Sequence, residues 1–192
     1  MAKYNEFNND DYLLKTNLLD INDFDELEQA EAFTFSIRAA QIEQGAYKIT
    51  AFSKKDFVDL HYQLFQDIYS FAGQFRKVQL MKGTTRFCQV QFLDAYASDL
   101  FNQLQNEPAW DSLVLAAKRL AYFKSELNML HPFREGNGRT TRIFLQEYTQ
   151  SKGFFWNYNK IDRNDYMQAM IRSVTSEDLL ENLFLKTLIR VN

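Results

Sequence analysis

The chain has 192 residues with a net charge of −3, and its 46% hydrophobic and 16% aromatic content exclude a disordered chain and indicate one well-buried core. Its cations form no dense cluster, which argues against direct nucleic-acid binding by counterion release. The single cysteine excludes an internal disulfide and favours a reducing, cytoplasmic setting, and no apolar run approaches the roughly 20 residues of a membrane-spanning helix.

The first predicted elements are helices, since only two prolines and six glycines interrupt the chain. Residues 1–21 are expected to form an N-terminal arm over the core. The segment 22–45 predicts a helix whose apolar face is Leu27, Ala30, Phe33, Ile37 and Ala40. A second helix is predicted at 53–72, with Ser53 as N-cap. Its apolar face comprises Phe57, Leu60, Leu64, Phe65, Ile68 and Phe71.

The stretch 76–93 breaks the helical pattern. Val78 and Leu80 alternate with polar residues, and the sequence KGTT then interrupts the alternation, which predicts a short β-hairpin, the only one expected. Helical patterns return at 92–106 and 111–129, then from the glycine-containing stretch to about Lys152, and finally at 162–172 and 176–190. We therefore expect a single all-α domain over residues 1–192, with one hairpin.

The stretch HPFREGNGRTTR, residues 131–142, packs a histidine, an acid, two glycines and three arginines into twelve positions. His131 follows a long apolar helix, and a neutral imidazole can accept a proton near neutral pH, although capping of the helix is the commoner role for such a histidine. Phe133 is expected to anchor the loop in the core. Glu135 is the only carboxylate here, and Mg²⁺ commonly takes one or two carboxylates beside phosphate oxygens. Alone, Glu135 would more often be a solvated charge.

The glycines of the same stretch predict a phosphate site. Gly136, Asn137 and Gly138 lead into a helix, where backbone N–H groups converge and the helix dipole attracts anions. Arg139 and Arg142 are three residues apart and share one helix face, and each guanidinium can bind phosphate with two hydrogen bonds. Two arginines beside such a nest indicate a polyphosphate.

These residues resemble the signature of the Fic family, which reads His, any, Phe, any, Asp or Glu, Gly-Asn-Gly-Arg, any two, Arg. Residues 131–142 match it without a gap. The likeness extends to 60–76, which resembles the family's helix before its flap, to 80–87, which resembles the flap, and to 166–170, which resembles a late helix beside the nucleotide base. It implies an all-α Fic helical bundle with a short β-hairpin flap near the active site.

The resemblance implies a protein adenylyltransferase, which moves AMP from ATP with Mg²⁺ to a Tyr, Thr or Ser hydroxyl of a target protein and releases pyrophosphate. His131 would be the general base and Glu135 would hold the metal. The nucleotide would be bound by Gly136, Asn137, Gly138, Arg139, Arg142, Lys82 and Gln168. The flap that docks an extended target segment would include Lys82, Gly83 and Thr84. A glycine at 138 favours AMP transfer over the kinase activity of a branch with a bulkier residue there.

Other outcomes stay open at this point. They are a Fic-type phosphotransferase, transfer of another nucleotide, removal of AMP, or a non-catalytic binding module, although His131 and the glycine nest are intact. His61 lies on an amphipathic helix, where packing or exposure explains it adequately.

Regulation is expected to come from a second protein. Many relatives carry an inhibitory helix of the form Ser or Thr, any three, Glu, then Gly or Asn. Ser173 and Glu177 have the right spacing, but the following Gly or Asn is missing, and Thr175 or Ser176 is better explained as the N-cap of the last helix. We therefore expect no inhibitory helix in this chain and a separate small antitoxin that carries one.

Overall fold

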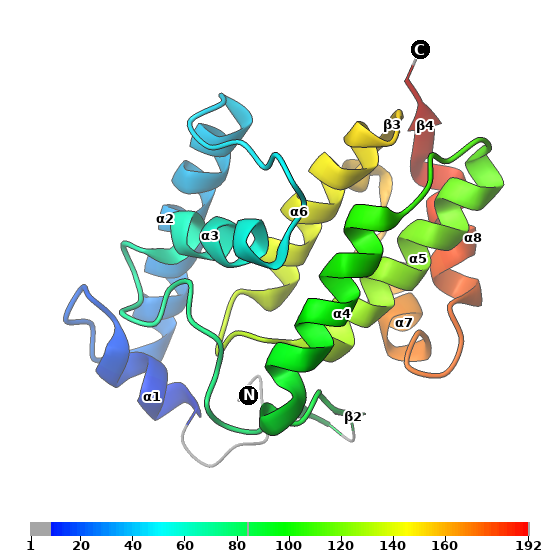
Figure 1. Cartoon of the computed structure of the whole chain (residues 1–192). Coiled ribbons are helices and arrows are strands. Elements are labelled where there is room, and N and C mark those ends of the chain that lie inside the picture. Colours follow the sequence, from blue (N-terminus) through cyan, green and yellow to red (C-terminus); the bar gives the residue numbers. More distant parts are fainter. Residues whose placement is uncertain (1–8, 84, 192) are drawn as a thin grey trace.

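Helices account for most of the chain in the computed structural model, which describes residues 9–83 and 85–191 (Figure 1). In chain order the elements of these residues are α1 (Asn9–Thr16), α2 (Phe24–Glu43), α3 (Lys54–Phe65), β1 (Met81–Lys82), β2 (Thr85–Arg86), η1 (Val90–Phe92), α4 (Leu93–Asn106), α5 (Leu113–Leu130), α6 (Asn137–Ser151), β3 (Phe154–Trp156), η2 (Tyr158–Lys160), α7 (Arg163–Arg172), α8 (Asp178–Thr187) and β4 (Leu188–Arg190). The predicted all-α fold with a hairpin is confirmed.

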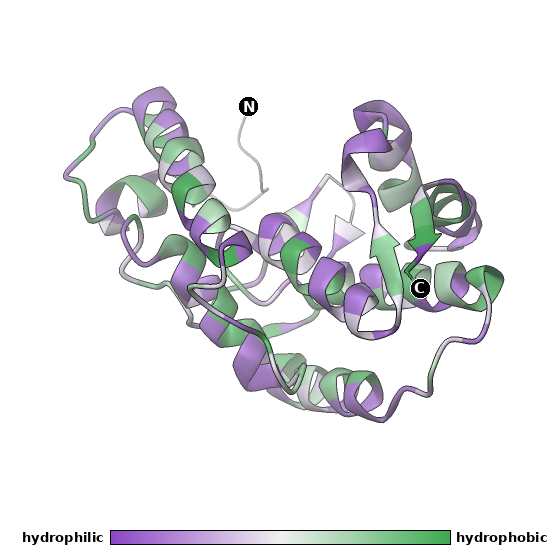
Figure 2. Cartoon of the chain, turned by 90° about the horizontal axis from the view of Figure 1, so that it is seen from above, coloured by the Kyte–Doolittle hydropathy of each residue, from purple (hydrophilic) through white to green (hydrophobic). Residues whose placement is uncertain are grey.

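Helix α5 is the centre of the core, because it packs against α4, α6 and α8. Its apolar face is buried at Ala116, Ala117, Leu120, Phe123 and Leu127, whereas Leu113, in its first turn, is 37% exposed. Figure 2 shows hydrophobic and hydrophilic residues on different sides of several helices, as expected for helices with one buried face. The site-bearing loop follows α5 directly, so the most buried helix of the fold positions it.

The predicted buried face of α2 is partly wrong. Leu27 is buried, but Phe33 is 68% exposed and Ile37 is 43% exposed. The inward face instead carries Glu31, which is 4% exposed, and Phe35, whose ring stacks on Phe65. The apolar spacing misled because a buried carboxylate occupies a position on the inward face.

Helix α3 begins as predicted and ends earlier. Ser53 Oγ accepts a hydrogen bond from the Asp56 N–H at 3.1 Å, and the Asp56 carboxylate accepts one from the Ser53 N–H at 3.0 Å, which is a capping box. All six predicted apolar residues are buried. The helix ends at Phe65 instead of 72 because the chain folds back, and Gly73, with φ of +72°, donates its N–H to His61 Nδ1 at 2.9 Å.

The β-structure differs from the prediction in extent. The hairpin lies inside 76–93, but its strands hold only two residues each, with Met81 opposite Arg86 and Lys82 opposite Thr85. Thr84 lies outside the described residues. A second antiparallel pair, β3–β4, was not predicted. The last helix therefore ends at Thr187 and does not reach residue 190 as predicted. The prediction missed these strands because segments of three residues are too short to show a clear period in the sequence.

The N-terminal arm contains α1, which packs against α2 and buries Leu13. The Leu18 N–H donates to the Ile68 carbonyl at 2.8 Å, which fixes the end of the arm to the turn after α3. Residues 1–8 lie outside the described residues. Within residues 9–83 and 85–191, no helix combines the length and apolar character needed to cross a membrane.

Candidate active site

The loop between α5 and α6 is buried and braced from several sides. Phe133 is 0% exposed, and its ring stacks on that of His61 with centroids 3.7 Å apart. The Asn137 side chain accepts from the Phe133 N–H and donates to the Phe133 carbonyl, both at 2.8 Å. The loop geometry is therefore fixed by the core, as expected for the anchoring role of Phe133.

His61 supports this loop and takes no part in the cavity. Because the Gly73 N–H donates to Nδ1, the ring proton lies on Nε2, which donates to the Glu135 carbonyl at 3.0 Å. Burial lowers the pKa of His61 to about 3, and the positive charge of Arg139 acts in the same direction. This histidine is thus a neutral structural residue.

His131 ends α5 in the left-handed conformation, with φ of 43° and ψ of 58°. Its Nδ1 lies 3.1 Å from the Asn128 carbonyl, which can only accept, so Nδ1 carries the ring proton and Nε2 keeps its lone pair. The ring stacks on Phe87 with centroids 3.7 Å apart. Burial lowers the pKa of His131 to about 3, with further lowering by Arg76, Lys82 and Lys124, so the imidazole is neutral at physiological pH.

Arg76 joins the hairpin to this histidine. Its Nε donates to the His131 carbonyl at 2.8 Å, and its other nitrogens donate to the carbonyls of Val78 and Cys88, on either side of the hairpin. Arg76 is 3% exposed. The hairpin and the backbone of His131 are thus held by the same buried guanidinium.

Glu135 and Arg139 belong to a buried ionic network. Arg139 Nη2 lies 2.6 Å from Glu31 Oε1 and 3.3 Å from Glu135 Oε1, and the guanidinium also lies over the rings of Phe35 and Phe65. The other oxygen of Glu31 accepts from the Tyr69 hydroxyl at 2.5 Å. Glu31 therefore holds Arg139 from α2, a role that the sequence did not reveal.

The two glycines at the start of α6 have different reasons to be glycine. Gly136 has φ of +78°, and a Cβ there would lie 2.4 Å from the Phe65 ring. Gly138 is helical, and a Cβ there would meet nothing within 4 Å. Position 136 requires glycine because of its positive φ and its contact with Phe65, whereas glycine at position 138 leaves space in front of the helix N-terminus.

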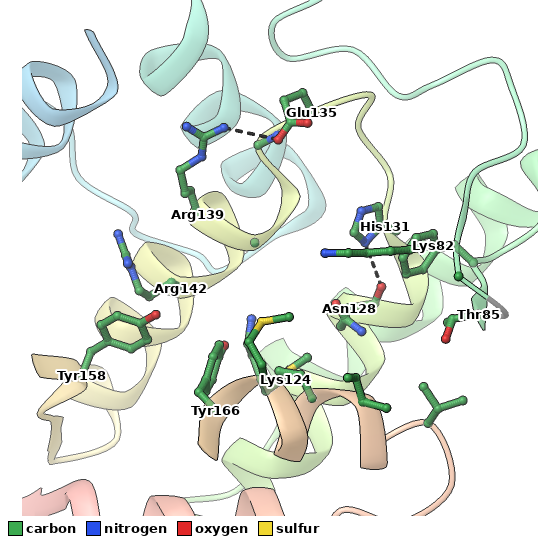
Figure 3. A pocket seen from close by; sticks show the side chains of 18 residues that line it. Lys82, Thr85, Lys124, Asn128, His131, Glu135, Arg139, Arg142, Tyr158 and Tyr166 are labelled. Carbon is green, nitrogen blue, oxygen red and sulfur yellow. Dashed lines mark hydrogen bonds and ion pairs between the residues drawn. The ribbon is translucent and has the colours of Figure 1, made fainter. Parts of the chain in front are cut away.

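A cavity of about 550 Å³ opens at this terminus (Figure 3). Its lining residues are Lys82, Gly83, Thr85, Phe87, Lys124, Asn128, His131, Glu135, Gly136, Gly138, Arg139, Arg142, Tyr158, Tyr166, Met167, Met170, Ile171 and Val174. Four of these are Lys or Arg and one is a carboxylate, so the polar half of the cavity suits a polyanion. The other half, from η2 and α7 onward, is aromatic and aliphatic, and suits a flat ring.

The structure brings most predicted site residues together at this cavity. His131, Glu135, Gly136, Gly138, Arg139, Arg142, Lys82 and Gly83 all line it. The Asn137 side chain is turned to the Phe133 backbone instead, and Gln168 is exposed on α7 outside the lining. Thr84 is not among the described residues.

Sequence reasoning missed Lys124 and Asn128, which line the cavity from α5. With His131 they occupy positions i, i+4 and i+7 on one helix face, so the spacing was a usable signal. This polar spacing was overlooked because the positions between Lys124 and His131 include the buried apolar residues of α5.

The residues with inhibitory spacing, Ser173 and Glu177, do not line the cavity. Ser173 ends α7, and Glu177 directly precedes α8. The predicted N-cap is wrong, because the helix begins at Asp178 and Ser176 Oγ accepts only a long 3.4 Å bond from its N–H. Within residues 9–83 and 85–191, no carboxylate forms an ion pair with Arg142, whose guanidinium lies 4.6 Å from the Tyr158 ring centroid.

Comparison with known proteins decides the family. The sequence profile of the Fic/DOC family matches residues 51–149, which include the buried loop and the start of α6. The chain belongs to the Fic/DOC family. It is 33% identical over 197 residues to the protein adenylyltransferase VbhT of Bartonella schoenbuchensis, covering 98% of this chain and 41% of VbhT.

Two other Fic/DOC relatives are matched over most of their length. The probable protein adenylyltransferase y4lH of Sinorhizobium fredii is 33% identical, covering 85% of this chain and 83% of y4lH. The probable protein adenylyltransferase Fic of Escherichia coli is 34% identical, covering 80% of this chain and 76% of that protein.

Solved structures share the Fic fold. BepC of Bartonella tribocorum, with bound AMPPNP, has a TM-score of 0.81 at 19% identity and 92% coverage of both chains. The N-terminal Fic domain of a Bep effector protein of Bartonella quintana, with bound ADP, has a TM-score of 0.81 at 20% identity, covering 92% of this chain and 91% of that one.

Proposed function

We propose that this chain is a protein adenylyltransferase, which transfers AMP from ATP to a Tyr, Thr or Ser hydroxyl of another protein. The observation that carries the proposal is the cavity, which combines a neutral imidazole, an open helix N-terminus and four Lys or Arg side chains. The names of VbhT, y4lH and the Escherichia coli protein support the same activity, and so do the nucleotides bound by the two structural neighbours.

The triphosphate fits the polar half of the cavity. The N–H groups at the start of α6 and the dipole of that helix attract phosphate oxygens, and Gly138 leaves open space in front of them. Arg142 is available to the phosphates. Arg139 contributes its charge from within its ion pairs, so we assign it a positioning role toward Glu135 in addition to phosphate binding. The base would lie against the apolar side chains that line the cavity from α7, such as Met167 and Met170.

The transfer step needs a base and a defined direction. Nε2 of His131 takes the proton of the target hydroxyl as its oxygen forms a bond to the α-phosphorus of ATP. The bond from the α-phosphorus to the oxygen bridging to the β-phosphate breaks, and pyrophosphate leaves with that electron pair. The Nδ1 bond to the Asn128 carbonyl stabilises the imidazolium, which afterwards returns its proton to water.

Magnesium fits the donors present when the nucleotide supplies the other ligands. Residues 9–83 and 85–191 contain no cluster of three or more His, Cys, Asp or Glu that would make an all-protein metal site. Glu135 lines the cavity as a single carboxylate, which matches the usual preference of Mg²⁺ for one or two carboxylates plus phosphate oxygens. When bound there, Mg²⁺ would neutralise phosphate charge.

The hairpin is the proposed docking site for the target. Among the described residues its two strands pair only with each other, so each has an edge that an extended segment can join by backbone hydrogen bonds. Lys82 and Gly83 line the cavity, and Phe87, just after the hairpin, stacks on His131. A segment paired with the hairpin would therefore present its side chain beside the imidazole. Thr84 is included in the proposed docking site because of the resemblance of residues 80–87 to the flap of the family.

We also propose that the enzyme works in the cytoplasm under the control of a small antitoxin. The observation behind this is the absence of an acidic partner for Arg142 among the described residues, which leaves room for a glutamate from another chain. Co-purification with a short helical protein whose Ser/Thr-xxx-Glu glutamate is needed for inhibition would support the proposal. Inhibition of the isolated chain by its own residues would contradict it.

Labelled ATP separates adenylyl transfer from the alternatives. Cell lysate is incubated with the protein and ATP labelled on either the α- or the γ-phosphate, and protein-bound label is measured. We expect incorporation of the α-label alone. Incorporation of the γ-label would indicate a phosphotransferase, and no incorporation in the presence of ATP binding would indicate a binding module. Lys118→Ala, at an exposed position of α5 outside the cavity lining, is the control and should incorporate label normally.

A further inference from the structure

Lys124 is a buried cation that neither the sequence motif nor the proposed transfer step uses. It lies on α5, two turns before His131, and is only 2% exposed. Its side chain lines the cavity, and its Nζ lies 5.8 Å from the Tyr166 ring centroid. Within the part of the chain that the structure describes, its amine has neither an ion pair nor a hydrogen bond to an acceptor.

An ammonium in this position is unfavourable in the empty protein. Burial, followed by the positive charge of Arg142, lowers the pKa of Lys124 from 10.5 to about 7. The groups that interact with it are Arg142 from α6, His131 from α5 and Tyr166 from α7, and none of them is an anion. The one carboxylate of the cavity lining, Glu135, is ion-paired with Arg139. Because a buried charge is normally paired, the missing partner points to an anionic ligand.

Arg142 indicates which part of the ligand is bound there. Its guanidinium also lacks a carboxylate partner among the described residues, and its positive charge contributes to the lowered pKa of Lys124. Figure 3 shows Lys124 reaching into the cavity between Arg142 and His131. Along α5, Lys124 and His131 are about 10 Å apart at 1.5 Å per residue. This separation allows the α-phosphate to react beside His131 while another phosphate of the same triphosphate lies beside Lys124.

We propose that the ammonium of Lys124 acts with Arg142 to bind the β- and γ-phosphates of ATP and the pyrophosphate that leaves. This inference rests on the proposed function and adds a binding residue to it. When the bond from the α-phosphorus breaks, pyrophosphate gains one negative charge, and the ammonium lies where that charge develops. AMP, which remains beside His131, has no phosphate at this position.

Binding of inorganic pyrophosphate, ATP and AMP by calorimetry at pH 6.5 tests the inference. We expect Lys124→Met to weaken binding of pyrophosphate and ATP by about tenfold or more and to leave AMP affinity within about twofold. Lys124→Arg retains the charge and should bind pyrophosphate nearly as the unchanged protein does. Lys118→Met, an exposed lysine on the same helix, is the control and should bind all three ligands normally.

Two results would overturn the inference. One is unchanged pyrophosphate affinity in Lys124→Met, and the other is an equal loss for AMP and ATP, which would place the ammonium beside the nucleoside or α-phosphate. A second measurement uses pH. Relative to Lys124→Arg, the unchanged protein should lose pyrophosphate affinity between pH 6 and 8.5, as its amine loses the proton, and parallel curves for the two proteins would contradict us.

The inference and the proposed function can fail separately. If the unchanged protein binds pyrophosphate through Lys124 but never incorporates α-label, the function is wrong and the site stands. If α-label is incorporated and Lys124→Met behaves as the unchanged protein in all three titrations, the function stands and the site is wrong.

Discussion

Replacing Lys124 by Met should stabilise the protein, and by an amount that depends on pH. In the unfolded chain the amine keeps its proton up to a pKa near 10.5, whereas in the folded chain it loses the proton above about 7. Between these values the unfolded state binds more protons, so the free energy of unfolding of the unchanged protein rises with pH. The methionine variant has no such titration.

The size of the effect follows from the lowered pKa. One pH unit corresponds to about 1.4 kcal/mol, so the unchanged protein should gain about 3 kcal/mol relative to the variant between pH 7 and 9. Below pH 7 the amine is protonated in both the folded and the unfolded state, and Lys124→Met then exceeds the unchanged protein in free energy of unfolding by the largest amount. Lys124 also lowers the pKa of His131, but that imidazole is neutral in the fold over the pH range compared, so its titration adds little to the difference between the two proteins.

Urea unfolding at pH 6.5 and 9 measures this difference directly. Lys124→Met should be more stable at pH 6.5, and its advantage should shrink by about 3 kcal/mol at pH 9. Lys118→Met should show no pH-dependent difference, because that lysine is exposed. An advantage of the same size at both pH values would refute the reasoning, since it would mean that burial does not disfavour the ammonium.

Three further substitutions test the loop and its support. Gly136→Ala should lower the free energy of unfolding by at least about 2 kcal/mol in urea, because its Cβ would meet Phe65 at 2.4 Å and its φ is positive. Gly138→Leu should unfold at an unchanged or higher urea concentration, because leucine favours the helix more than glycine does. It should bind ATP at least about tenfold more weakly in calorimetry, since its side chain enters open cavity space. Full ATP affinity would contradict the proposed phosphate position. Glu31→Gln should lower the free energy of unfolding by about 3 kcal/mol, because Arg139 loses a buried anionic partner. A loss within about 0.5 kcal/mol, as at ordinary surface sites, would show that the Arg139–Glu31 ion pair is dispensable.

The parts of the fold that the sequence revealed are those with strong local signals. The capping box at Ser53 and the long apolar stripe of α5 placed those helices closely, and the dense motif placed the loop and the start of α6. Its residues converge because they are near neighbours along the chain, so no long-range pairing had to be inferred.

The parts that were missed depend on tertiary contacts. Glu31 lies on α2, more than a hundred residues from Arg139, and nothing in its own segment indicates an ionic partner. The exposed Phe33 and Ile37 suggested the wrong face for the same helix. The pair β3–β4 brings residues 154–156 beside 188–190, and segments of three residues carry too little pattern to be recognised.

The most direct test of the central claim compares ATP binding and α-label incorporation in one preparation of His131→Ala and of the unchanged protein. The account predicts ATP affinity within about threefold and incorporation lower by at least about 10²-fold, which is the usual contribution of a general base. Incorporation by His131→Ala at the rate of the unchanged protein would contradict it.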